Sequence, residues 1–96
     1  MSDDILVKAR KLAADIADDI ERLGHWQGDA EDQNGCCIIT SPSWREYRIA
    51  GDDHVRLTLV DALGFNTLLL MDLYNWNDTT PTEEVLAKLR AVANGD

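Results

Sequence analysis

A run of apolar residues at helical spacing near the start of the chain constrains the fold more than any other feature. Gly24 ends this run, and a glycine just past the last periodic residue is typical of a helix C-terminus. Ser2 or Asp3 can cap the start of the helix. The pattern predicts an amphipathic helix of about five turns. Its apolar stripe contains Ile5, Leu6, Ala9, Leu12, Ala13, Ile16, Ile20 and Leu23.

Two segments in the last third of the chain predict further helices. Residues 67–76 are apolar on nearly every side, which is typical of a central helix enclosed by others. Thr80, Pro81 and Glu83 then supply an N-cap, a proline at the first helical position and a glutamate at the third. We therefore expect the last helix to begin at Pro81. Its inward face would contain Val85, Leu86, Leu89, Val92 and Ala93.

The middle of the chain permits two structures. Residues 24–35 are polar and aperiodic, which predicts a loop, and residues 43–46 have the Ser-x-x-Glu spacing of a capping box, which favours a short helix. Residues 47–49 and 55–59 nevertheless alternate apolar and polar side chains around a turn-like segment, as in a β-hairpin. Asp53 could instead cap a helix that ends at Gly64, and we favour this interpretation. We therefore predict a mainly α fold, a compact bundle of four or five helices in one domain over residues 1–96. An α+β fold with a small hairpin over residues 44–60 is the alternative.

Composition excludes several classes of protein. The 96 residues include 18 acidic and 9 basic side chains, for a net charge of -9, and 45% are hydrophobic. The apolar share argues against a disordered acidic tail, and the longest apolar run, residues 68–71, is too short to cross a bilayer. Excess carboxylates repel phosphate backbones and anionic lipids, so we expect neither direct nucleic-acid binding nor membrane association. The acidic first residues do not resemble a signal peptide, which favours the cytoplasm.

Between residues 15 and 32 the chain has seven acidic side chains and one basic residue, Arg22. Such a run keeps a protein soluble, meets a partner of opposite charge, or mimics the phosphates of DNA and so occupies a DNA-binding protein. All three interpretations are open at this point. For a basic protein partner, we predict a contact surface that includes Asp15, Asp18, Asp19, Trp26, Asp29, Glu31 and Asp32.

Two adjacent cysteines, Cys36 and Cys37, occur in a chain that also contains His25 and His54, and zinc binds thiolate and imidazole ligands. Side chains of neighbouring residues diverge, however, and no Cys-x-x-Cys pair is present. We therefore expect no metal and no cofactor, and we expect both cysteines to be buried as small apolar side chains. A small enzyme or metal-binding protein centred on the two cysteines, His25 and Asp78 is the alternative, because a histidine can activate a thiol nucleophile.

A Gly-Cys-Cys sequence at 35–37 is followed by Trp-Asn-Asp at 76–78, a Thr-x-x-Glu helix start and Glu-Val-Leu-Ala-Lys-Leu-Arg at 84–90. With these features the chain resembles the domain of unknown function numbered 6197, an uncharacterised family of actinobacteria and their bacteriophages. The resemblance spans the first helix, the Gly-Cys-Cys and the last third, but residues 40–43 interrupt a stretch that the family usually continues as a helix. It implies an α-rich domain of phage or actinobacterial origin. Its signature residues are Gly35, Cys36, Cys37, Trp76, Asn77 and Asp78.

Size, acidity and the resemblance together lead to a functional hypothesis. We expect a non-enzymatic, protein-binding accessory factor that acts on a host protein, in the cytoplasm of a bacterium or a phage-infected cell. Its partner would have a basic surface. The sequence leaves self-association open.

Overall fold

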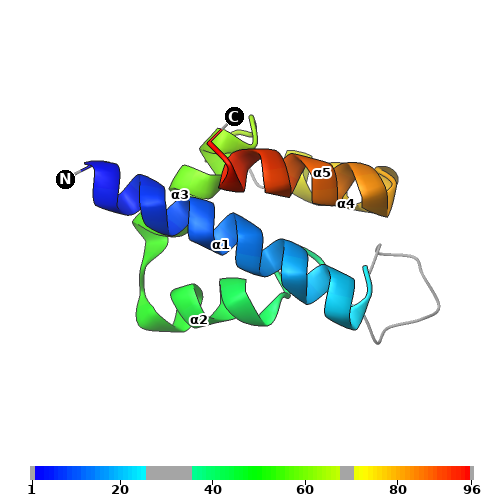
Figure 1. Cartoon of the computed structure of the whole chain (residues 1–96), viewed down its shortest axis with the longest axis horizontal. Coiled ribbons are helices and arrows are strands. Elements are labelled where there is room, and N and C mark those ends of the chain that lie inside the picture. The colour runs from blue at the N-terminus through cyan, green and yellow to red at the C-terminus, as the bar shows by residue number, and fades with distance from the viewer. Residues whose placement is uncertain (1, 26–35, 68–70, 96) are drawn as a thin grey trace.

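The computed structural model describes residues 2–25, 36–67 and 71–95, and this part of the chain forms five helices and contains no strand. They are α1 (Ser2–Leu23), α2 (Pro42–Ala50), α3 (Asp53–Ala62), α4 (Met71–Thr79) and α5 (Thr82–Ala93). Figure 1 shows α1 crossing the middle of the molecule, with α4 and α5 on one side and α2 on the other. The predicted mainly α bundle is confirmed. The alternative hairpin over residues 44–60 is wrong, because α2 and α3 occupy those positions.

The apolar stripe of α1 forms the centre of the core. Its middle turns are fully buried because α1 packs against α2, α3 and α5. Each of these neighbours adds apolar side chains to the same cluster, among them Trp44 of α2, Leu59 of α3 and Leu89 of α5. Such burial stabilises a small domain by roughly 1.5–3 kcal/mol for each large side chain. The buried residues of α1 are Ala9, Leu12, Ala13, Ile16, Ala17 and Ile20.

Helix α2 begins differently from the prediction. Ser41, and not Ser43, is the N-cap: its hydroxyl oxygen accepts a hydrogen bond from the backbone N–H of Trp44, and Pro42 occupies the first helical position. Proline fits this position because the first N–H of a helix has no intrahelical partner. Gly51 ends the helix with a φ of 77°, in the left-handed region where glycine is favoured.

Two predictions for the last third need correction. In its described part the predicted helix is not enclosed by the others, because only Leu73 and Asn77 are buried in α4 and Met71 is 54% exposed. Residues 68–70 of the prediction lie outside the described residues. Leu73 contributes to the core, whereas most other side chains of α4 are exposed or partly exposed. Helix α5 begins one residue later than expected, with Pro81 as the N-cap residue and without a side-chain cap. None of the helices in the described part of the chain is long and apolar enough to span a membrane.

Candidate functional site

His25 follows directly after α1 and joins three segments that are distant in the sequence. Gly24 turns the chain with a φ of 96°, and its carbonyl oxygen accepts a hydrogen bond of 2.8 Å from the backbone N–H of Cys36. The backbones of His25 and Cys36 consequently run side by side in an isolated parallel bridge. This bridge brings the histidine and the first cysteine of the sequence-based hypothesis together.

Both nitrogen atoms of the His25 ring have hydrogen-bond partners. Nδ1 lies 2.9 Å from the hydroxyl oxygen of Thr82 in α5, and Nε2 lies 2.8 Å from Oδ1 of Asn77 in α4. An amide oxygen only accepts, so Nε2 carries a hydrogen and, in the neutral ring, Nδ1 accepts the hydroxyl hydrogen of Thr82. Asn77 is 4% exposed, and its amide nitrogen donates to Asp78 over 3.1 Å. We call His25, Asn77 and Thr82 the histidine clasp.

The clasp gives one of the signature residues, Asn77, a structural role. The His25 ring ties the end of α1 to the junction between α4 and α5, which are otherwise joined through a short turn at Thr80 and Pro81. A ring with both nitrogens engaged must give up a hydrogen bond before it can take a substrate proton or a metal ion. Within residues 2–25, 36–67 and 71–95, no group of three or more His, Cys, Asp or Glu side chains is arranged to hold a metal ion.

Both cysteines are buried free thiols, which confirms the prediction of burial. Cys36 is 4% exposed, and its pKa is raised from 9.0 to about 11, first because burial disfavours the thiolate and then because the Asp19 carboxylate lies nearby. The thiol of Cys37 lies 3.2 Å from the hydroxyl oxygen of Thr40. Because the thiolate is the reactive form of cysteine, these surroundings make Cys36 a poor nucleophile at neutral pH.

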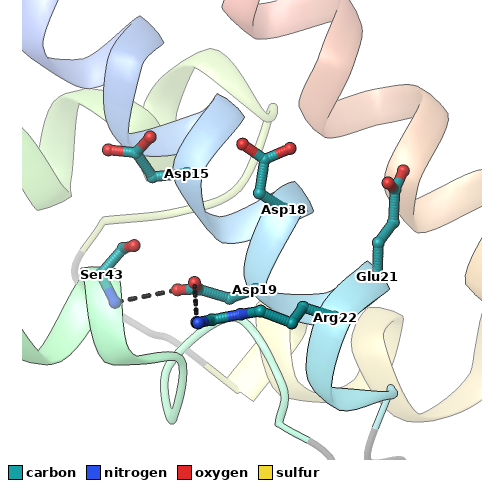
Figure 2. A pocket seen from close by; sticks show the side chains of 6 residues that line it. All are labelled: Asp15, Asp18, Asp19, Glu21, Arg22 and Ser43. Atoms are coloured by element: carbon teal, nitrogen blue, oxygen red, sulfur yellow. Dashed lines mark hydrogen bonds and ion pairs between the residues drawn. The ribbon is translucent and has the colours of Figure 1, made fainter.

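Asp19, one of the predicted partner contacts, is instead part of the interior. It is 6% exposed, and its carboxylate accepts hydrogen bonds from the backbone N–H of Ser43 over 3.0 Å and from Arg22 over 3.1 Å (Figure 2). An anion beside the first turn of α2 is favourable because the unpaired N–H groups there carry partial positive charge. Asp19 therefore connects α1 to the start of α2.

Asp18 and Glu21 of α1 are exposed and Asp15 is partly exposed, and each of them pairs with a basic side chain. Arg90 of α5 donates to Asp18 over 2.8 Å and to Glu21 over 3.0 Å, and Lys11 pairs with Asp15 over 3.1 Å. The pKa of Arg90 is raised by these hydrogen bonds, Glu21 first and Asp18 second. The sequence segment alone gave no sign of this neutralisation, since the run contains only Arg22.

Figure 2 shows the carboxylates of Asp15, Asp18 and Glu21 projecting from α1, while Asp19 turns toward α2. These residues, together with Arg22 and Ser43, line an open hollow of about 530 Å³. A second hollow of about 230 Å³ lies next to it and shares the lining residues Asp15 and Ser43. The second hollow is lined by Lys11, Asp15, Ser43, Glu46, Tyr47, Ala50 and Asp52.

We call the two hollows together the acidic groove. Its lining has six acidic side chains and two basic ones, Lys11 and Arg22. Sequence reasoning missed Glu46 and Asp52, because they lie beyond the acidic run and approach it only through the packing of α2 on α1. The predicted contacts Trp26, Asp29, Glu31 and Asp32 lie outside the described residues, as does Gly35 of the family signature.

Comparison of the chain with family models, with curated proteins and with solved structures finds no match.

Proposed function

We propose that this chain is a small, acidic, non-enzymatic accessory protein that binds a basic segment of another protein in the acidic groove. The observation that carries the proposal is the groove itself. An open hollow along the junction of α1 and α2, lined by six carboxylates and two cations, suits lysine and arginine side chains more than any other protein chemistry.

The exposed carboxylates differ in their expected roles. Asp19 is buried and bonded within the fold, so it would support the groove without contacting a partner. Asp18 is 64% exposed and Glu21 52% exposed, and each has only Arg90 as an ion-pair partner in the described part of the chain. Exposed ion pairs contribute little, about 0–1 kcal/mol each, so an incoming guanidinium or ammonium can replace or share them at small cost.

The surroundings of the alternative centre favour a binding protein over an enzyme. His25 uses both ring nitrogens in the clasp, and burial raises the pKa of the Cys36 thiol to about 11. The His25 ring is therefore hydrogen-bonded within the fold, and the Cys36 thiol keeps its proton at neutral pH. Mimicry of DNA is less supported, because Asp19 faces inward and Arg90 neutralises the neighbouring pair, so the described carboxylates do not form an uninterrupted anionic row.

The resemblance to an actinobacterial and bacteriophage family motivates the finer part of the proposal. A phage-encoded protein of this size would act in the cytoplasm of the infected cell, and its basic partner would be a host protein. This part is independent of the groove geometry, so binding in the groove can be tested first with a defined basic peptide.

The test measures binding of a fluorescent peptide of alternating lysine and alanine by fluorescence anisotropy. The groove variant carries Asp15→Asn and Glu46→Gln; the control carries Asp61→Asn and Glu84→Gln, two exposed acids outside the groove. Both variants remove two negative charges, so they differ only in where on the protein those charges are lost. We expect the groove variant to bind about five-fold more weakly and the control to stay within about two-fold of the parent. Equal losses in the two variants would show nonspecific attraction to net charge and would overturn the proposal.

A further inference from the structure

Another hollow, separate from the acidic groove, has the opposite sign of charge. It measures about 310 Å³ and lies on the other face of α2 from the acidic groove. Two arginines line it in a protein whose net charge is -9. Its lining consists of Ile39, Thr40, Trp44, Arg48, Arg56 and Tyr74.

The two arginines have donor capacity that the fold does not use. The guanidinium of Arg56 lies over the Trp44 ring at 5.5 Å, pairs with Asp53 through Nη2, and has a buried Nε atom without a hydrogen-bond partner in the described part of the chain. The side chain of Arg48 forms no ion pair or hydrogen bond with the described residues. A guanidinium offers five N–H donors in a planar fork that matches a carboxylate. The hollow therefore presents one guanidinium without an ion-pair partner among the described residues, Arg48, and a second, Arg56, that is paired with Asp53, beside an aromatic surface.

A smaller and more apolar hollow adjoins this one. It measures about 190 Å³ and shares the lining residues Ile39 and Tyr74 with the arginine-lined hollow, so the two hollows lie next to each other. Leu73 lines its apolar part, and Asp78 lies at its rim. The combined space is lined by two arginines in the larger hollow, by aromatic and aliphatic side chains in both hollows, and by Asp78 in the smaller one. It falls within the size range of small-molecule sites.

We propose that this composite hollow binds an apolar organic acid with one carboxylate. The carboxylate would be bound by Arg48 and Arg56, in the charge-assisted geometry that arginine favours. The apolar body would lie against Trp44 and Tyr74 and extend toward Leu73. Asp78 at the far rim would repel a second carboxylate, which restricts the ligand to monoacids. The site is separate from the acidic groove, so either proposal can fail without the other.

The test follows the Trp44 indole N–H signal by NMR while 4-phenylbutyrate is added to the full chain. The neutral amide of the same acid and inorganic phosphate are the comparison ligands. We expect saturable shifts with the acid, at least about ten-fold weaker binding of the amide, and weaker binding of phosphate, which lacks the apolar body. No shift up to about 10 mM acid, equal binding of the amide, or equal binding of phosphate would each overturn the proposal.

A matched pair of arginine variants locates the site. Arg48→Gln removes a donor from the hollow, whereas Arg45→Gln removes the same charge from the same helix at an exposed position outside it. We expect the first to weaken binding of the acid about ten-fold and the second by less than about two-fold. Equal effects would refute the assignment. Arg56 is left unchanged because its contacts with Trp44 and Asp53 also support the fold.

Discussion

Removal of the His25 ring should destabilise the protein clearly, because the ring bonds two segments that are distant in the sequence. The ring makes one hydrogen bond to Asn77 and one to Thr82, and these bonds span 52 and 57 residues of sequence. Each hydrogen bond contributes about 0.5–1.5 kcal/mol net, and the lost packing of a half-buried ring adds a similar amount. We therefore expect His25→Ala to lower the free energy of unfolding by about 2–3 kcal/mol, which corresponds to a fall in Tm of roughly 10–20 °C in a domain of this size.

The assay is urea unfolding followed by circular dichroism, with His54→Ala as the matched control. His54 is exposed in the first turn of α3, so its replacement should change the free energy of unfolding by less than about 0.5 kcal/mol. A cycle that combines His25→Ala with Asn77→Ala should give a coupling energy of about 0.5–3 kcal/mol. If His25→Ala costs no more than His54→Ala, or if the cycle shows no coupling, the clasp does not hold α1 to the α4–α5 junction.

The remaining stability predictions concern Cys36 and Asp19. Because burial raises the pKa of the Cys36 thiol from 9.0 to about 11, the folded protein keeps a proton that the unfolded chain loses, so stability is full below pH 9 and decreases above it. Between pH 9 and pH 11 the free energy of unfolding of the parent should therefore decrease by about 2–3 kcal/mol more than that of Cys36→Ala. If the two proteins lose stability in parallel as the pH rises, the prediction is wrong. Asp19→Asn should cost about 1–3 kcal/mol in urea unfolding, because it weakens the bonds to Ser43 and Arg22. Asp18→Asn, at an exposed site, should cost under about 1 kcal/mol, and an equal cost would refute the interior role of Asp19.

Local sequence patterns predict the first and last helices, α1 and α5, close to their observed positions. The stripe of α1 and the inward face of α5 follow from apolar spacing, and both occur almost where the sequence placed them. The start of α2 was misassigned because two serines compete for the cap. The Ser41-Pro42 pair contains the signal that decides between them, since proline fits the first helical position directly after a cap.

The site depends on contacts that no local pattern encodes. Arg90 lies 72 residues from Asp18, yet it neutralises part of the acidic run, so a charge count within one segment overstates the field there. Arg22, the one basic residue within the acidic run, pairs with Asp19 of the same helix, whose carboxylate also accepts a hydrogen bond from Ser43 of α2. Asn77 lies 52 residues from His25 in the sequence, and only the folded chain brings the His25 ring to its side chain.

Helix α2 shows why net charge says little about what this protein can bind. Its residues at 43, 46, 47 and 50 recur at helical spacing and face the acidic groove, whereas those at 44 and 48, four positions apart, face the arginine-lined hollow. One helix of nine residues therefore contributes to two surfaces of opposite sign. The sign of each surface follows from the neighbours that α2 meets there, the carboxylates of α1 on one face and Arg56 of α3 on the other. A net charge of -9 is thus compatible with a site for an anion, because low dielectric and short distance make a few nearby guanidinium groups outweigh distant, screened carboxylates.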